Sequence, residues 1–438
     1  MFRAAPGALA SRIRLTRRSS FALDASILVA LLAASSAPTP LYAIYQAQWH
    51  FSALALTVVF SAYAVAMLLA LLTTGSLSDH LGRRPVLLAA LIAEAVVMVV
   101  LATADGVGQL IAARVLQGLA TGAATSAVGA ALLELEHPDR SGKAALTNSV
   151  APVAGMAAGV LGATLLVSFA PAPTVTVHLA LLAVFVLQAL ALVLTPETAP
   201  RRPGALRSLR PAVKVPASAR RAMLLAAPSV VAVWALGGFA SSLGPGLARL
   251  IDSSVLPAVS GLVFFALTVS AVLSVWGMGR FRAHVMVATG AGAVIPGVAL
   301  MVLSIQIDSL TALFAGSAVA GVGFGAVSQG VLRTILPRVT PQDRSGVLAA
   351  YYVISYLAMS VPAVLAGLLT VRYGLLTASV LFGGAVAALG VAALVAALAP
   401  GARTSCVPHR RSAVVATGGP SAAPSTCPPL PSLPSPRA

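Results

Sequence analysis

The residues most able to do chemistry are the few charged side chains that interrupt long apolar stretches. Arg114 and Glu94 each lie within such a stretch, and Asp24 lies near the start of the first one. A charged side chain at the centre of a bilayer costs about 2.5–3.5 kcal/mol, so such residues face a bundle interior or water and mark ion or substrate pathways. These residues are therefore candidates for moving a proton or binding a ligand.

Each of these three candidates also has a purely structural explanation. Gln117 and Thr121 share a helix face with Arg114 and give it polar neighbours, although an arginine near a helix end can also extend to the interface. Glu94 fits either a proton relay or a neutral packing residue, and Asp24 fits either a coupling role or a helix cap.

Uncharged polar residues in other apolar runs complete the candidate set. A tyrosine offers an apolar ring and one hydroxyl, which suits an amphiphilic ligand. The further candidates for a central cavity are Asn148, Gln329, Tyr351, Tyr352 and Tyr356. A separate aromatic group near the end of the first run predicts an interfacial belt and comprises Tyr42, Tyr45, Trp49 and Phe51.

Composition shows which elements must position these residues. Of 438 residues, 58% are hydrophobic and 9% are charged, and the mean hydropathy is +0.95. Soluble domains carry roughly a quarter charged residues, so an ordinary soluble enzyme, a disordered protein and a soluble solenoid are excluded. The chain is expected to be an all-α integral membrane protein. Its expected spans are about 22–45, 53–75, 86–104, 107–133, 144–169, 176–195, 222–247, 257–278, 284–304, 309–333, 346–370 and 374–398.

The positions of the basic residues predict the orientation of these spans. Of the 28 Lys and Arg residues, 25 fall in the two tails and in alternate gaps on one side. The positive-inside rule therefore predicts an even number of spans with both termini cytoplasmic. Because the net charge of +17 lies in these gaps, with no interleaved aromatics, nucleic acid is not an expected partner.

An internal repeat supports the same count. Asp139-Arg140-Ser141-Gly142 recurs 204 residues later as Asp343-Arg344-Ser345-Gly346. Gly118 and Gly122 recur as Gly321 and Gly325, and Pro40 recurs as Pro245, at nearly the same offset. Two six-helix bundles related as parallel repeats are therefore expected. The predicted segments are a basic tail (1–21), a first bundle (22–195), a linker (196–221), a second bundle (222–399) and a disordered tail (400–438).

The gap between the second and third spans carries the most specific motif, Gly75-Ser76-Leu77-Ser78-Asp79-His80-Leu81-Gly82-Arg83-Arg84-Pro85. Glycines permit a tight turn, and a carboxylate beside arginines can form an ion-pair network that breaks as helices move. The predicted gating residues are Gly75, Asp79, Gly82, Arg83 and Arg84, with Glu134 or Glu136 as partners of the arginines.

This motif resembles the G-x-L-x-D-x-x-G-R-R signature of the major facilitator superfamily, and only His80 departs from it. Arg114-Val115-Leu116-Gln117-Gly118 is similar to the R-x-x-Q-G element of that family. Asp24 ahead of Pro38-Thr39-Pro40 is similar to an element of its proton-coupled export branch. The resemblance implies that Arg114 lies at a central cavity and takes part in proton or substrate coupling.

One motif departs from the antiporter pattern G-x-x-x-G-P-x-x-G-G. Gly155 and Gly159 keep the small-residue face of the fifth span, but Val160 replaces the proline. Plain helix packing explains these glycines as well as an antiporter role does. The direction of transport is therefore less firmly indicated than the fold.

The expected function is secondary active transport by alternating access: proton-coupled efflux of a small hydrophobic or drug-like compound across the plasma membrane, by a monomer that uses no cofactor. A proton-coupled importer of a sugar or organic acid is the main alternative. Direct ATP hydrolysis is excluded because no phosphate-binding G-x-x-x-x-G-K-[ST] loop is present. A membrane-embedded enzyme is disfavoured because all six histidines are placed in loops or at helix ends, and a sensor is disfavoured because no folded soluble domain is expected.

Overall fold

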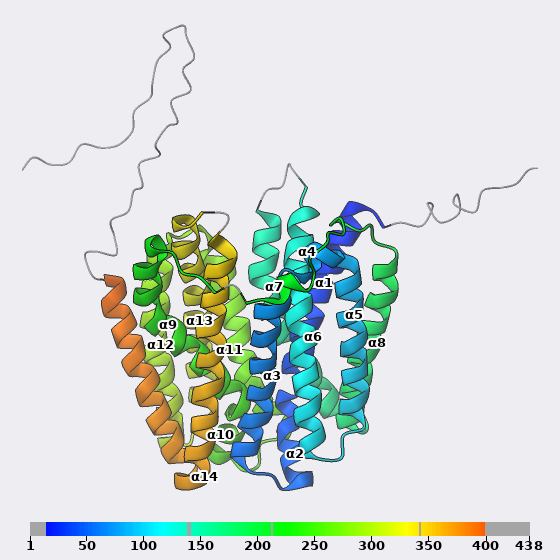
Figure 1. The fold of residues 1–438 in the computed structure, drawn as a ribbon. Coiled ribbons are helices and arrows are strands. Elements are labelled where there is room, and N and C mark those ends of the chain that lie inside the picture. Colours follow the sequence, from blue (N-terminus) through cyan, green and yellow to red (C-terminus); the bar gives the residue numbers. More distant parts are fainter. Residues whose placement is uncertain (1–14, 138–141, 212, 341–342, 399–438) are drawn as a thin grey trace, which may run out of the picture. The chain divides into compact units, whose positions relative to one another are not determined.

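The computed structural model describes residues 15–398 except 138–141, 212 and 341–342, and these residues form helices and no strand (Figure 1). Part of the basic tail, most of Asp139-Arg140-Ser141-Gly142 and the tail from 400 onward lie outside the described residues. The first half comprises α1 (Arg17–Ser36), η1 (Thr39–Leu41), α2 (Tyr42–Trp49), α3 (Ala53–Thr74), α4 (Leu77–Leu81), α5 (Arg83–Ala102), α6 (Val107–Glu134), α7 (Lys143–Phe169) and α8 (Pro173–Val193). The second comprises η3 (Arg207–Leu209), α9 (Ala217–Ser242), α10 (Gly244–Ile251), α11 (Pro257–Gly277), η4 (Met278–Arg280), α12 (Ala283–Gln306), α13 (Leu310–Ile335), η5 (Leu336–Arg338) and α14 (Arg344–Leu398).

The count of twelve spans is confirmed. Eleven described helices are long and apolar enough to cross a bilayer. The last of them, α14, contains a break at Gly374, where φ is 83° and the chain turns back. Glycine tolerates this left-handed backbone without a side-chain clash. α14 therefore supplies two spans, and twelve apolar helices cross the membrane.

The first and seventh spans are interrupted at matching places, which the expected continuous runs did not show. η1 and α2 follow α1, with Pro40 inside η1. α10 follows α9 and has a proline, Pro245, in its first turn. Proline lacks the backbone N–H that would continue a helix, but it fits a new first turn. The related prolines thus mark the same structural break in both halves.

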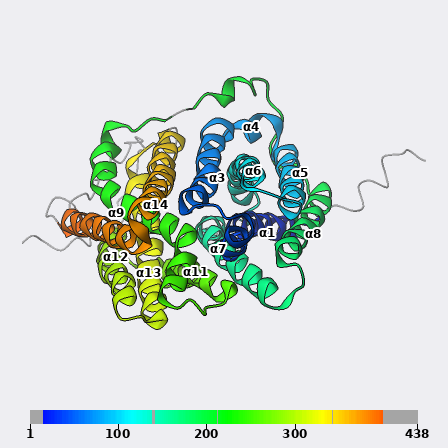
Figure 2. The same ribbon diagram turned by 90° about the horizontal axis from the view of Figure 1, so that it is seen from below.

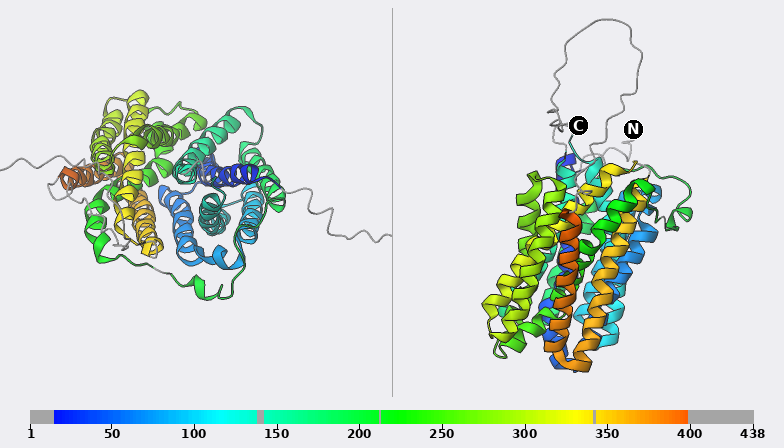
Figure 3. Two further views of the ribbon diagram at one scale, coloured as in Figure 1. Left: turned by 90° about the horizontal axis from the view of Figure 1, so that it is seen from above. Right: turned by 90° about the vertical axis from the view of Figure 1, so that its left-hand side faces the viewer.

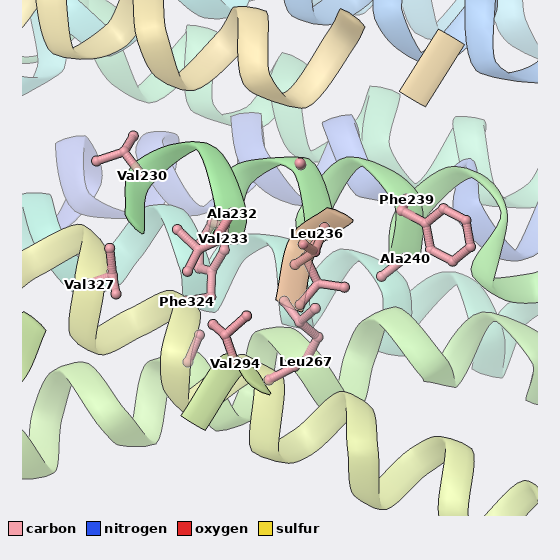
Figure 4. Close-up of a cluster of buried hydrophobic side chains, with 14 of the residues drawn as sticks. Val230, Ala232, Val233, Leu236, Phe239, Ala240, Leu267, Val294, Phe324 and Val327 are labelled. Carbon is pink, nitrogen blue, oxygen red and sulfur yellow. The ribbon is translucent and has the colours of Figure 1, made fainter. Parts of the chain in front are cut away.

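Each half has its own hydrophobic core. One cluster of buried side chains runs from Phe21 to Leu192. The other lies mainly between Ala219 and Val386. Figure 2 shows the corresponding two groups of helices, and Figure 4 shows α9 packing Val233 and Leu236 against residues of neighbouring helices. The structure therefore has two six-helix bundles, as the repeat predicts.

The repeated glycines make equivalent contacts in the two bundles. A Cβ added at Gly118 would strike the backbone of Tyr63 on α3, and one at its counterpart Gly321 would strike the backbone of Leu267 on α11. The second span packs on the fourth in one half, and the eighth on the tenth in the other. Small residues allow this close backbone approach.

Gly155 and Gly159 on α7 also serve helix packing. A Cβ at Gly155 would strike Val29 of α1, and one at Gly159 would strike Ala33 of the same helix. These contacts account for both glycines through packing against α1.

Two local expectations for the first span are wrong. Tyr42 and Tyr45 are 2% and 1% exposed, so they pack inside the protein and not in an interfacial belt, although Tyr45 stacks on Trp49 with ring centroids 4.7 Å apart. Asp24 is not in a first helical turn, because α1 begins at Arg17 with Thr16 as its N-cap. A capping role for Asp24 is therefore excluded.

Candidate functional site

A cavity of about 300 Å³ lies between the two bundles. Helices α1, α3, α6 and α7 of the first half and α9, α11, α13 and α14 of the second contribute to its lining. Most of the exposed surface of its walls is apolar, although hydroxyl and amide side chains, among them Ser35, Thr125, Asn148 and Gln329, also line it. Such a wall suits a ligand whose surface is largely apolar.

At the end of the bundles that carries α2 and α10 (Figure 1), the two halves are in close contact. There, a Cβ at Gly261 of α11 would lie 2.8 Å from the Cβ of Pro40. Nearby, Ser61 of α3 donates a hydrogen bond from its Oγ to the carbonyl oxygen of Ser360 at 3.2 Å. Towards the opposite end, which carries α4, the lining continues as far as Ser149 and Leu332.

Arg114 is the only charged side chain among the described residues that line the cavity. It is 0% exposed, and its Nη1 donates to Gln117 Oε1 at 2.5 Å and to the Ser35 carbonyl at 3.0 Å. The guanidinium carbon lies 4.2 Å from the ring centroid of Tyr63, a cation–π distance. Its Nε and Nη2 have no hydrogen-bond partner among the described residues.

Glu94 lies directly behind Arg114. It is 0% exposed, and its carboxylate accepts hydrogen bonds from Thr121 Oγ1 at 2.6 Å and from Gln117 Nε2 at 3.5 Å. Gln117 therefore bridges Arg114 and Glu94, which are the only basic and the only acidic side chain in this part of the described structure. A buried charge requires a partner or a proton. Glu94 can meet this requirement in two ways: as a carboxylate balanced by Arg114, or as a neutral acid.

The second bundle contributes a cluster of aromatic rings. The ring of Trp234 lies 5.5 Å from that of Phe324 and 5.4 Å from that of Tyr356. Tyr356 donates a hydrogen bond to the sulfur of Met67 at 3.1 Å, and Tyr63 donates to the same sulfur at 3.3 Å. Aromatic faces and a thioether offer large, polarizable contact surface.

The structure separates the predicted cavity residues into three groups. Those that line the cavity are Arg114, Asn148, Gln329, Tyr351, Tyr352 and Tyr356. Gln117 and Glu94 form a layer behind Arg114 and are not in the lining. Asp24 is 4% exposed and lies elsewhere in α1, so it contributes nothing to the described wall.

Sequence reasoning missed several residues of this site. Trp234 and Phe324 line the cavity, and a tryptophan in the middle of an apolar run could have indicated this. The placement of His178 was wrong: it lies within α8, is 1% exposed, and bonds through Nδ1 to the Thr174 carbonyl at 2.6 Å. Its Nε2 has no hydrogen-bond partner among the described residues.

The predicted gating motif forms a short helix, α4, followed by a sharp turn. Gly75 is the C-cap of α3, and Gly82 takes a φ of 97° immediately before α5. This turn places Arg83 against Asp79, with Nη1 2.5 Å from the carboxylate. On its other side, Arg83 Nη2 lies 2.8 Å from Glu134 at the end of α6. Glu134 is thus the partner of Arg83, as expected.

Glu197, which follows α8, completes this network and had no sequence signal. Its carboxylate accepts hydrogen bonds from the backbone N–H groups of Arg83 at 2.8 Å and Arg84 at 3.2 Å. It thereby caps the first turn of α5, where a negative charge is favourable. The carboxylate of Glu136, in contrast, accepts from the Ala144 N–H at 2.9 Å. The motif therefore ties α3, α5, α6 and the end of α8 together.

The comparison of sequences decides the family. The profile of the Major Facilitator Superfamily matches residues 25–361. The chain belongs to this superfamily. It is a multi-pass membrane transporter and not an enzyme. No curated protein matches the chain closely enough to count as a relative.

Solved structures share the fold of this transporter at low identity. The nucleoside transporter NupG is 12% identical, with a TM-score of 0.66, over 87% of this chain and 99% of that one. The human organic anion transporter MFSD10 (TETRAN) is 18% identical, with a TM-score of 0.62, over 87% and 100%. A bacterial homolog of the human lysosomal transporter Spinster, in an inward-facing and occupied conformation, is 12% identical, with a TM-score of 0.67, over 87% and 95%.

Proposed function

We propose that this transporter exports a small, uncharged, mainly apolar compound in exchange for protons. The observation that carries the proposal is the cavity itself: an aromatic and aliphatic chamber with a single charged side chain, Arg114, in its described wall. A sugar would need a larger set of polar partners, because each unpaired hydroxyl buried in this chamber would cost free energy.

The contacts of Arg114 suggest how a proton controls ligand binding. When Glu94 is ionised, the group formed by Glu94, Gln117 and Arg114 is electrically balanced, and the chamber beside it suits an apolar ligand. When Glu94 takes up a proton, the charge of Arg114 is unbalanced, and an apolar ligand covering it must desolvate an unpaired cation. Proton and ligand therefore disfavour each other, which is the requirement for exchange.

Alternating access supplies the movement that this exchange needs. The two bundles rock about the cavity, and the network of Asp79, Arg83 and Glu134 forms and breaks at the end that carries α4. A proton crossing 100 mV releases about 2.3 kcal/mol, which drives the export step. The distribution of basic residues supports placing that end, and both termini, on the cytoplasmic side of the plasma membrane.

One observation favours a second candidate, import of an organic acid together with protons. Nε and Nη2 of Arg114 lack hydrogen-bond partners among the described residues, and these two donors form the edge of a guanidinium that a carboxylate binds with two parallel hydrogen bonds. An anion would bind best when Glu94 is protonated. The same residues would then couple proton and substrate in the same direction.

Transport into everted vesicles distinguishes these candidates. With an acid-inside gradient, the proposal predicts uptake of a neutral apolar dye that an uncoupler abolishes. Uptake that survives the uncoupler would exclude proton coupling, and proton-linked movement of an aromatic carboxylate in place of the dye would select the second candidate. Arg114→Ala should abolish the coupled uptake, whereas the exposed Arg280→Ala should not.

A further inference from the structure

The linker between the bundles carries a set of fixed, exposed positive charges. We call residues 197–216 the linker strap. Its exposed arginines are Arg201, Arg202, Arg207 and Arg210. In the sequence, no Asp or Glu occurs between Glu197 and Asp252. These cations therefore have no acidic neighbour along the chain beyond the first residue of the strap.

Hydrogen bonds to both halves hold the linker strap in place. The Arg202 N–H donates to the His80 carbonyl at 2.8 Å, and Ser76 Oγ donates to the Ser208 carbonyl at 3.1 Å. At the other end, the Lys214 N–H donates to the Gly346 carbonyl at 3.4 Å. The strap is thus a positioned surface and not a free tether.

The strap lies at the periphery of the helices, at the end of the bundles that carries α4. Figure 2 and the left view of Figure 3 show it running around the outside of the helices past α4, away from the space between the bundles. In the same segment, Leu206 is 85% exposed. An exposed leucine beside arginines is unfavourable in water but favourable at a bilayer interface, where the chain meets acyl and headgroup atoms together.

We propose that the linker strap is a docking surface for anionic phospholipid headgroups. Arg207 begins the turn η3 and Arg210 follows it; both pair with lipid phosphates, while Leu206 enters the headgroup boundary. Charge complementarity selects anionic over zwitterionic lipid. The strap contains no aromatic residue, so it lacks the base-stacking side chains that single-stranded nucleic acid binding uses.

Lipid retention by the purified full-length chain tests this surface. The protein is incubated with phosphatidylglycerol or phosphatidylcholine, and the lipid that remains bound is counted by native mass spectrometry at low and high salt. The double variant Arg207→Gln/Arg210→Gln should retain phosphatidylglycerol about tenfold less strongly. Phosphatidylcholine binding should not change, and added salt should reduce the difference.

The matched control is Arg280→Gln/Arg282→Gln, which removes two exposed arginines from the gap between α11 and α12 and should retain lipid as the unmodified chain does. Leu206→Ser should weaken retention of phosphatidylglycerol without changing its salt dependence.

Equal retention of the two lipids by the unmodified chain would overturn the proposal. So would an equal loss in the control, or displacement of phosphatidylglycerol by inorganic phosphate.

Discussion

The two bundles share a scaffold but differ in chemistry. Both break their first helix at a proline, and both pack their second helix on their fourth through glycines. In the first bundle, however, Asp24, Glu94, Arg114 and His178 are buried inside spans. In the described part of the second, charged residues and histidine occur only near the ends of spans, and the interior wall is aromatic. In the proposed mechanism, a duplicated scaffold leaves proton coupling to one half and much of the ligand surface to the other.

The largest expected effect comes from neutralising Glu94, the acid that contacts Gln117 beside Arg114 in the first bundle. Glu94→Gln keeps the shape and most hydrogen-bonding capacity of the side chain but cannot release a proton. We expect gradient-driven transport in vesicles to fall about 100-fold, because proton transfer at a positioned side chain is lost. Binding of the apolar dye should also weaken, because a neutral glutamine, like protonated Glu94, leaves the charge of Arg114 unbalanced.

Glu136→Gln is the matched control for this change, since its carboxylate accepts a hydrogen bond at the start of α7, outside the cavity wall. It should leave coupled transport intact. Near-normal coupling in Glu94→Gln would show that Glu94 does not carry the proton. Equal losses in both variants would show that the loss of transport is not specific to Glu94.

A second test concerns the close helix packing through glycines that both bundles share. Gly118→Val and Gly321→Val, at corresponding positions of the repeat, each push a side chain into the backbone of the neighbouring helix. Overpacking of this kind costs about 1–3 kcal/mol, so both variants should unfold at clearly lower temperatures, and by similar amounts. Thermal unfolding in detergent measures this. Gly384→Val, which meets no atom within 4 Å, should unfold normally, and a large inequality between the first two would argue against equivalent packing.

A third test separates ligand binding from coupling. Trp234→Ala removes the ring that contacts both Phe324 and Tyr356 in the second bundle. We expect the ligand Kd to rise about tenfold, since buried aromatic anchors dominate such contacts. The number of protons exchanged per ligand should not change. Trp276, which is 73% exposed, provides the control Trp276→Ala. A changed proton ratio in Trp234→Ala would contradict the division between the bundles.

Much of the fold follows from the sequence because run length and glycine spacing are local properties. The apolar runs predict the spans to within a few residues, and the glycine repeat predicts the paired bundles. The breaks at Pro40 and Pro245 escaped this reasoning, because apolar residues continue across them. The start of α1 was also placed too late, since Arg17 and Arg18 lie inside the helix.

The candidate site is less predictable, because it depends on which helix faces meet. Arg114 could be found from its cost in a bilayer. That Gln117 would turn towards Glu94 depends on how α5 packs on α6, which spacing along one helix cannot show. The contributions of Trp234 and Glu197 likewise arise only when distant segments come together.

The smallest expected effect comes from removing one hydrogen bond between the two bundles. The hydroxyl of Tyr356 donates to the sulfur of Met67 at 3.1 Å, so Tyr356→Phe loses one weak hydrogen bond while the ring stays in place. Since a neutral hydrogen bond contributes about 0.5–1.5 kcal/mol, we expect ligand affinity to fall about threefold in equilibrium binding. The exposed Tyr373→Phe should bind normally. The pH dependence of transport should not move in either variant, because this hydroxyl belongs to the ligand surface. A shift in that pH dependence for Tyr356→Phe would mean that the second bundle also takes part in proton coupling.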